Sequence, residues 1–391
     1  MPLNDDTVVA PATAPGVGAI AIVRMSGPLA LKLLKRFFHP IGRGRGVKSF
    51  QHRRLVLGDF VAPGDREPID QVMAAVMRSP HSYTGEDVVE VYCHGSPAIV
   101  LEIVEALCHA GARLAQPGEF TRRAFENGRL DLTQAEAICD VVQSATSAAS
   151  RMALRQLAGQ LLQSIGGVRA WLIDFAAEVE ARLDFPEDDI EPADQRRLDE
   201  LLAQAESALA ELVRQGRRGR VLREGARIVL VGRPNVGKSA LLNALVGRER
   251  AIVSPHPGTT RDTIECTLDL EGIAVTVVDT AGWRASGDEI ERKGVERTEN
   301  EIAVADLIIW VVDRSEPLTD EDRAIAKRLL ARPTVVACNK SDLPAALDSA
   351  TIQSLGFDAD RVVSVCALRS EGVADLERRV VAVLFGEEQL C

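Results

Sequence analysis

The sequence has little of what would mark a secreted, membrane-spanning or zinc-binding protein. Its seven cysteines are scattered, with no C-x-x-C pair and no partnered histidine cluster, which argues against a disulfide framework and a zinc site. The N-terminus lacks the cationic start and apolar core of a secretory signal. No apolar run approaches the roughly 20 residues that a membrane span needs. We therefore expect a cytoplasmic protein without a membrane span.

Positive charge is also scarce. Lysine and arginine total 46 against 57 acidic residues, which gives a formal net charge of −11. A protein that coats nucleic acid would be basic overall, so any nucleic acid must be met by a local patch. The arginine-rich stretch at 214–227 either contacts RNA phosphates or forms the solvated end of a helix and a linker.

The length of 391 residues predicts two or three domains. We expect an N-terminal α/β domain over 1–118, a helical domain over 119–220 and a third domain over 221–391. In the first, β-like runs at 19–23, 72–77 and 88–92 accompany a helical pattern at 97–109. This mixture predicts an α+β fold.

Residues 119–216 are helical in character. Thr133 and Glu136 form a T-x-x-E pattern that predicts a capping box at the start of a long helix, which Gly166–Gly167 can interrupt. A second helix is expected from about 194 to 216, after an acidic, proline-bounded connector at 184–192 that is typical of a solvated turn. Helices with one wide apolar stripe need partners, so we expect a bundle.

From residue 226 strands and helices alternate, which predicts a doubly wound, mainly parallel sheet. The sequence G-R-P-N-V-G-K-S at 232–239 follows a strand at 227–231 and opens a helix at 240–246. In this context its glycines let backbone N–H groups cradle phosphates. Lys238 would then supply positive charge to the β- and γ-phosphates, and the Ser239 hydroxyl would bind Mg²⁺.

Two further motifs follow strands in the order that a GTPase needs. In D-T-A-G at 279–282, Asp279 would lie near the metal and the Gly282 N–H near the γ-phosphate. In N-K-S-D at 339–342, Asp342 can accept two hydrogen bonds from guanine that adenine cannot donate. A base-backing loop, C-A-L at 366–368, follows the last strand and has Cys366 where similar GTPases more often have serine. Together they indicate GTP as the nucleotide.

The loop S-P-H-P-G-T-T-R-D at 254–262 has the position of a switch I segment. Thr260 is our candidate for the residue that completes the Mg²⁺ shell when a γ-phosphate is present. Trp283 stands where Ras-like GTPases have a water-orienting glutamine, and tryptophan cannot polarise water. From chemistry alone, any of Asp288, Glu289 and Glu291 can take that role.

These motifs together resemble the family of tRNA modification GTPases known as MnmE or TrmE, one of the TrmE-Era-EngA-like GTPases. Sequences outside the G domain carry the resemblance further: S-Y-T-G-E-D-V-V-E at 82–90, P-G-E-F-T-R-R-A-F at 117–125, L-D-L-T-Q-A-E-A-I at 130–138 and L-D-F-P-E-D-D-I at 183–190. They separate this family from generic small GTPases, and the resemblance covers essentially the whole chain.

The resemblance implies a function. Members hydrolyse GTP and, with an FAD-dependent protein of the MnmG/GidA type in a heterotetramer, form 5-carboxymethylaminomethyluridine at the tRNA wobble position. Their N-terminal domain is similar to folate-dependent one-carbon enzymes, forms a homodimer and binds 5-formyl- or 5,10-methylene-tetrahydrofolate. At the matching positions Arg24, Glu90 and Arg129 would contact the folate; position 129 is often lysine in the family.

The resemblance also implies a K⁺ ion that supplies the positive charge of an arginine finger, and two G domains that meet across their switch regions. Asn235 would hold K⁺ with oxygens of Ser254, His256 and Thr259, while Ser239 and Thr260 bind Mg²⁺. Glu291 would orient the attacking water, so the catalytic residues are Glu291, Lys238 and Thr260. The residues expected to contact GTP are Asn235, Val236, Gly237, Lys238, Ser239, Ala240, Ser254, Pro255, His256, Pro257, Gly258, Thr259, Thr260, Asp279, Thr280, Ala281, Gly282, Asn339, Lys340, Ser341, Asp342, Cys366, Ala367 and Leu368.

Family chains continue past the G domain with helices that finish the bundle and end in a motif of the F-C-I-G-K kind. This sequence ends about 20 residues after the base-backing loop, and Cys391 lies in no such motif, so that cysteine's role is not carried over. Either the chain is truncated or it is a divergent form, and the incomplete bundle is expected to expose part of an apolar face.

Two other functions fit parts of the sequence. One is a GTP switch in ribosome assembly or regulation that binds RNA or protein, although such proteins often carry an RNA-binding module after the G domain. The other is a folate-binding regulator with a vestigial G domain, against which the intact Lys238, Ser239, Thr260 and Asp279 argue.

Overall fold

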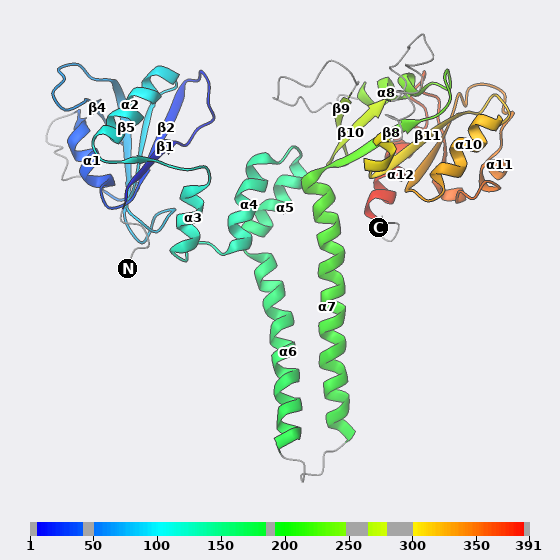
Figure 1. Ribbon diagram of the computed structural model, residues 1–391, viewed down its shortest axis with the longest axis horizontal. Helices are drawn as coiled ribbons and strands as arrows, with labels where there is room; N and C mark the ends of the chain where they lie inside the picture. The colour runs from blue at the N-terminus through cyan, green and yellow to red at the C-terminus, as the bar shows by residue number, and fades with distance from the viewer. Residues whose placement is uncertain (1–5, 42–50, 185–191, 248–264, 280–299, 387–391) are drawn as a thin grey trace. The chain divides into compact units, whose positions relative to one another are not determined.

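The computed structural model describes residues 6–41, 51–184, 192–247, 265–279 and 300–386. The chain divides into two compact units, Met1–Glu136 and Ala137–Cys391 (Figure 1). The predicted domain limits at residues 118 and 220 stay predictions.

The first unit is built on a seven-stranded sheet in the order β3-β4-β5-β6-β2-β1-β7. Described neighbours pair antiparallel, except for β1 and β7, which are parallel. The α+β prediction for this region is confirmed. The elements are β1 (Val8–Pro11), β2 (Ile20–Ser26), α1 (Ala30–Phe37), β3 (Phe38–Pro40), β4 (Val56–Phe60), β5 (Asp70–Met77), β6 (Val88–His94), α2 (Pro97–His109), β7 (Arg113–Leu114) and α3 (Glu119–Glu126).

The central strands of this sheet have two different faces. Along β2, Ala21, Val23 and Met25 are buried in a core that α1 and α2 complete. Because side chains alternate along a strand, Arg24 lies on the other face, opposite Glu90 of β6. The sheet register thus brings together two residues that are far apart in the sequence.

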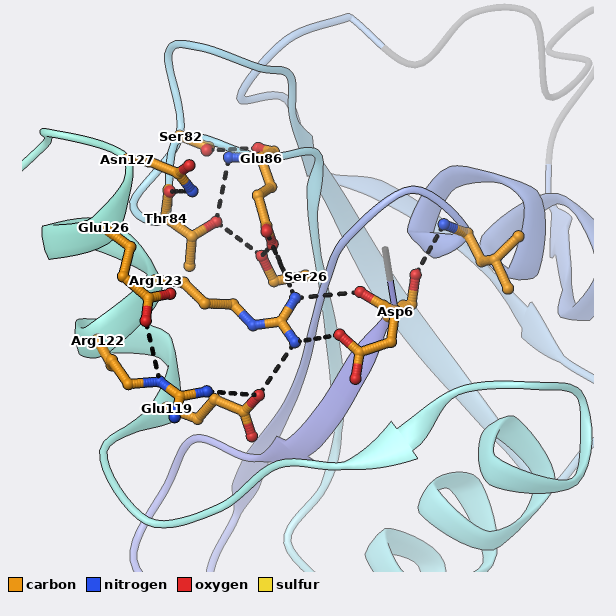
Figure 2. A network of polar contacts seen from close by, with 12 residues as sticks. Asp6, Ser26, Ser82, Thr84, Glu86, Glu119, Arg122, Arg123, Glu126 and Asn127 are labelled. Carbon is orange, nitrogen blue, oxygen red and sulfur yellow. Dashed lines mark hydrogen bonds and ion pairs between the residues drawn. The ribbon is translucent and has the colours of Figure 1, made fainter. Parts of the chain in front are cut away.

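A buried arginine joins α3 to this sheet, as Figure 2 shows. The side chain of Arg123 is fully buried, and its guanidinium pairs with carboxylate oxygens of Asp6 at 2.6 Å, Glu119 at 3.0 Å and Glu86 at 3.2 Å. Arg113 pairs with the same Glu119 at 2.7 Å. Three carboxylates therefore surround one buried cation, and removal of one partner from such a cluster typically costs about 3–5 kcal/mol.

Glu119 makes this cluster sensitive to acid. Hydrogen bonds from Arg113, with further ones from the backbone N–H of Gln116 and from Arg123, outweigh burial and lower the pKa of Glu119 from 4.5 to about 2. A carboxylate whose pKa is depressed on folding contributes stability above its unfolded pKa and loses it as the pH falls through its folded pKa. The window therefore runs from about pH 4.5 down to about pH 2.

We predict that Glu119→Gln destabilises the first unit by about 3 kcal/mol at pH 7 and flattens its loss of stability between pH 5 and pH 2. The chain's two tyrosines, Tyr83 and Tyr92, both lie in this unit, so fluorine NMR of fluorotyrosine-labelled protein during urea unfolding reports on it alone. The matched control is Glu126→Gln on the same helix, whose 3.6 Å surface pair with Arg122 should contribute less than about 1 kcal/mol. Equal effects of the two variants would contradict the account.

The helical part comprises α4 (Leu132–Gln143), α5 (Ser147–Leu157), α6 (Gln160–Asp184) and α7 (Pro192–Glu224), with α6 and α7 side by side (Figure 1). Three local predictions were wrong. The capping box is formed by Asp131 and Gln134, whose side chains each accept the other's backbone N–H, because α4 begins one residue before Thr133. Helix α6 continues through Gly166–Gly167, and α7 extends to Glu224 rather than residue 216.

Apolar side chains remain accessible between these two long helices. They line a hollow on α6 and α7 formed by Ile165, Val168, Leu172, Ile173, Leu209 and Leu212 together with Arg169 and Ala176. Ile173 is 51% exposed and Leu209 is 46% exposed. The exposed apolar face expected from the sequence is therefore present in this part of the described chain.

The rest of the second unit is a six-stranded sheet in the order β13-β12-β11-β8-β10-β9, in which β9 alone is antiparallel to its neighbour. Apolar clusters cover both faces, one completed by α8 and α12 and the other by α10 and α11. The doubly wound, mainly parallel prediction is confirmed. The elements are β8 (Ala226–Val231), α8 (Lys238–Val246), β9 (Glu265–Leu270), β10 (Ile273–Asp279), β11 (Leu307–Asp313), α10 (Asp320–Leu329), β12 (Thr334–Asn339), α11 (Ser349–Gln353), η2 (Ala359–Arg361), β13 (Val362–Ser364) and α12 (Val373–Phe385).

A search of the described helices finds none with the length and apolar character required to cross a membrane.

Candidate nucleotide-binding site

The phosphate loop joins β8 to α8 at the carboxyl edge of the sheet. Three of its residues have positive φ: Gly232 with 154°, Asn235 with 64° and Gly237, the N-cap of α8, with 98°. Asparagine and glycine are the residues that tolerate this conformation best. The turn leads directly into the first turn of α8, whose free N–H groups and positive dipole end suit an anion.

Lys238 is held inside this loop. Its ammonium donates to the carbonyl oxygens of Gly232 at 2.5 Å and Arg233 at 2.8 Å, and the residue is only 7% exposed. Burial lowers the pKa of Lys238, and the nearby Asp279 offsets this only in part. The ammonium's hydrogen bonds go to neutral carbonyls, and a nucleotide phosphate would supply a directly bonded counter-charge.

A hydroxyl and a carboxylate meet beside Lys238. Ser239 Oγ donates to Asp279 Oδ2 at 2.8 Å, because β10 pairs in parallel with β8 and ends at the level of the loop. Oxygen ligands of these two kinds fit Mg²⁺, which is bound in nucleotide sites by few protein groups and by phosphates. Elsewhere in the described chain no group of three or more histidine, cysteine, aspartate or glutamate side chains could hold a metal ion.

Asn339 connects three loops of the site. Its Nδ2 donates to the carbonyl oxygen of Val236 at 2.8 Å, and its Oδ1 accepts from the backbone N–H of Ala367 at 3.0 Å. A Cβ at position 237 would collide with the Asn339 amide, so Gly237 permits this close approach as well as the left-handed turn. The phosphate loop, the N-K-S-D segment and the base-backing loop are thereby fixed relative to one another.

The one carboxylate of the N-K-S-D segment, Asp342, lies beside the base-backing loop. The buried Cys366 thiol donates to Asp342 Oδ1 at 3.2 Å, and the Arg369 guanidinium lies 3.9 Å from Oδ2. The side chain of Asp342 is 17% exposed, whereas Leu368 is 86% exposed. Cys366 therefore orients the carboxylate that sequence reasoning assigned to guanine recognition.

The structure describes only part of the predicted site. Outside the described residues lie Ser254, Pro255, His256, Pro257, Gly258, Thr259, Thr260, Thr280, Ala281, Gly282 and Glu291. The remaining candidates for GTP contact, from the phosphate loop, Asp279, the N-K-S-D segment and the base-backing loop, are brought to one edge of the sheet.

The three residues proposed for folate lie in the first unit. Arg24 Nε donates to Glu90 Oε1 at 2.8 Å, and the Arg24 guanidinium lies 5.4 Å from the Tyr83 ring centroid. The hydroxyl of Tyr92 donates to the other Glu90 oxygen at 2.8 Å, and burial together with Glu90 raises the pKa of Tyr92. The side-chain stem of Arg129 packs near Gly85. The geometry thus joins Arg24 and Glu90 directly, with Arg129 beside the turn that follows Tyr83.

Sequence reasoning missed two residues that the structure makes prominent. Arg123 lies within the P-G-E-F-T-R-R-A-F motif, but nothing in the pattern shows that its guanidinium is the buried one. Asp313 ends the strand L-I-I-W-V-V-D and pairs with Lys340 at 2.5 Å. An acidic residue that closes a wholly apolar strand was the available signal for Asp313.

Fold and site together define a P-loop G domain with a guanine-recognition motif, preceded by a helical segment and an α+β unit. Two family models match the chain: "GTP-binding protein TrmE N-terminus" over residues 7–129 and "MnmE helical domain" over residues 132–390. The "tRNA modification GTPase MnmE" of Heliobacterium modesticaldum is 46% identical over 386 residues, which cover 98% of this chain and 82% of that protein. The protein of the same name from Moorella thermoacetica is 42% identical over 391 residues, covering 99% and 83%. The chain belongs to the MnmE family of tRNA modification GTPases.

Among solved structures, a variant of Aquifex aeolicus Era bound to GDP and AlF4− is 26% identical, over 42% of this chain and 59% of that one. Its TM-score of 0.34 is too low for a structural comparison.

We predict that Cys366→Ser strengthens guanine nucleotide binding by about two- to fivefold, because a hydroxyl is a better donor than a thiol to Asp342. Cys366→Ala should weaken binding by a similar factor. Titration with a fluorescent GDP analogue gives both dissociation constants. Cys266→Ser, which changes a partly buried thiol of β9, is the control and should leave the affinity unchanged. Unaltered binding in Cys366→Ala would remove the role assigned to the thiol.

Proposed function

We propose that this chain is a K⁺-dependent GTP hydrolase that acts with an FAD-dependent protein of the MnmG/GidA type to form 5-carboxymethylaminomethyluridine at the tRNA wobble position. The single observation that carries the GTPase part is the Asn339 linkage, which unites the phosphate loop with the guanine-recognition segment. The relatives are named as tRNA modification GTPases, and this supplies the substrate class. A cytoplasmic location accords with that substrate.

Several side chains would each have a separate role in GTP hydrolysis. Lys238 would pair with the β- and γ-phosphate oxygens in place of its present carbonyl partners, because a phosphate offers it a full counter-charge. Ser239 and Asp279, already in contact, would hold Mg²⁺ directly or through water, with Thr260 as a further ligand. When bound, Mg²⁺ neutralises charge that develops on the phosphate oxygens. Glu291 would orient the attacking water and accept its proton.

K⁺ would be held at the other side of the phosphates by Asn235 and by oxygens of Ser254, His256 and Thr259. The support for this proposal is the left-handed backbone of the exposed Asn235, within the turn that leads to the phosphate site. A cation there would supply the positive charge that other GTPases obtain from an arginine finger. In keeping with the family resemblance, we expect two G domains to pair across their switch regions during hydrolysis.

The first unit would bind a tetrahydrofolate derivative, either 5-formyl or 5,10-methylene, through Arg24, Glu90 and Arg129. The support is the Arg24–Glu90 pair beside Tyr83. A carboxylate can hydrogen-bond a pterin edge, and arginines suit the carboxylates of a glutamate tail.

The same unit would form the homodimer. Leu57, Met73, Tyr92 and Ile22 lie in register across four adjacent strands on the face opposite α1 and α2. Leu57 is 47% exposed and Met73 is 37% exposed. A row of apolar side chains of this kind favours burial against another sheet or chain.

The alternative of an RNA-binding switch has weaker support. Within the arginine-rich stretch, Arg214 pairs with Glu211 and Arg220 with Glu224, each one turn away on α7. These intrahelical pairs are typical of a solvated helix and compete with phosphate contacts.

We predict that GTP turnover is at least about tenfold faster in KCl than in NaCl at equal ionic strength, since K⁺ alone would provide the missing charge. Asn235→Gly should abolish the difference and retain GDP affinity, because glycine keeps the left-handed backbone and removes only the amide. Asn243→Ala, on the exposed face of α8, is the control and should remain K⁺-stimulated. Equal, slow rates in the two salts would argue against the K⁺ site and for the plain GTP switch.

A further inference from the structure

Asp313 is a buried carboxylate to which the reaction scheme above gives no task. Its side chain is 3% exposed at the carboxyl end of β11. Burial alone would raise the pKa of Asp313, but hydrogen bonds from Lys340 and Ser315 outweigh burial and lower it. Specific partners thus keep the carboxylate ionised in the interior. Because a buried ion pair often costs stability relative to apolar residues, its presence suggests a role other than stabilisation.

Both oxygens of this carboxylate are engaged. Oδ1 accepts from the backbone N–H of Ser315 at 2.9 Å and from its hydroxyl at 2.6 Å, which fixes the orientation of the group. Oδ2 accepts from the Lys340 ammonium at 2.5 Å. Ser315 therefore aims one oxygen of Asp313 at Lys340.

The sheet register brings the two segments of this contact together. Strands β11 and β12 are parallel neighbours, and Asp313 lies opposite Asn339 in the ladder. The next ladder bond runs from the Arg314 N–H to the Asn339 carbonyl at 2.9 Å. Lys340 follows with a left-handed backbone, φ of 61°, so the chain turns sharply at the residue that Asp313 holds.

Lys340, itself among the residues expected to contact GTP, stands between two residues with assigned roles. Asn339 links the phosphate loop to the base-backing loop, and Asp342 is the carboxylate assigned to guanine recognition. A lysine ammonium two residues from Asp342 would be a ready ion-pair partner for it, and such a pair would compete with the two guanine donors. In the described structure the Lys340 ammonium pairs with Asp313 instead. Asp342 contacts the Cys366 thiol at 3.2 Å, and the nearest guanidinium, that of Arg369, lies 3.9 Å away.

We propose that Asp313 is a positioning residue for guanine recognition, which holds the Lys340 ammonium away from Asp342 and so leaves that carboxylate to read the base. This inference rests on the proposed GTP function and extends it to specificity. Asp313 touches no nucleotide; it acts through Lys340.

The test is the affinity and base selectivity of Asp313→Asn in the full chain, measured with GDP and with IDP, which lacks the 2-amino group. GDP affinity should fall roughly ten- to hundredfold, the range of one charge-assisted hydrogen bond. The ratio of the IDP to the GDP dissociation constant should also fall. In the variant, an Asp342 carboxylate paired with Lys340 would accept a weaker hydrogen bond from the 2-amino group of guanine. The KM for GTP should rise, whereas kcat should stay within about twofold of the wild-type value, since the contacts to the phosphate groups are unchanged.

A double-mutant cycle separates positioning from structural support. If Asp313 acts through Lys340, Asp313→Asn should have no further effect on GDP affinity in a Lys340→Met background. Asp360→Asn is the matched control, because it removes the carboxylate of an ion pair with Arg379, 3.2 Å apart, in the same domain. It should leave the selectivity unchanged.

Three results would overturn the inference: wild-type affinity in Asp313→Asn, weaker binding with an unchanged IDP to GDP ratio, or an equal loss in the Lys340→Met background. The last two would make Asp313 a structural residue. Failure of the wild-type chain to bind GDP would instead contradict the proposed GTP function, so the two outcomes are distinguishable.

Discussion

The nucleotide site depends on one buried amide, that of Asn339. Its two hydrogen bonds join the phosphate loop to the base-backing loop, and each uses a different atom of the side chain. An amide offers a donor and an acceptor in a fixed plane, which aspartate and leucine of similar size do not. The constraint extends to Gly237, where any side chain would collide with this amide. Phosphate binding and base recognition are therefore coupled through a single residue of β12.

In the first unit, separate segments are linked by a buried charge rather than by an amide. Arg123 connects α3 to the N-terminal segment and to the turn that carries Glu86, and it does so as a fully buried cation. That turn also carries Tyr83 and Gly85, which lie beside Arg24 and Arg129. The proposed folate residues thus rest on a scaffold whose strength varies with pH through Glu119.

Motifs with a fixed chemical task were predictable from the sequence, and long-range partners were not. The phosphate loop, Asp279 and the N-K-S-D segment were each expected at the end of a strand, and a strand ends at each of them. The helix at 97–109 was also predicted correctly, since proline opens it and a glycine follows its end. The Asp131–Gln134 capping box was missed because two overlapping patterns compete at one helix start. Asp313 and Arg123 were missed because the partners that set them apart, Lys340 for Asp313 and Asp6 and Glu86 for Arg123, lie in segments that only the fold brings close.

The most direct test of this account is calorimetric titration of Asn339→Ala with GDP, beside the wild-type chain. If the amide couples the two loops, loss of both buried hydrogen bonds should weaken GDP binding by about a hundredfold while the folded structure persists. Circular dichroism of the same samples checks the fold. GDP binding as tight as in the wild type would contradict the claim that Asn339 organises the site.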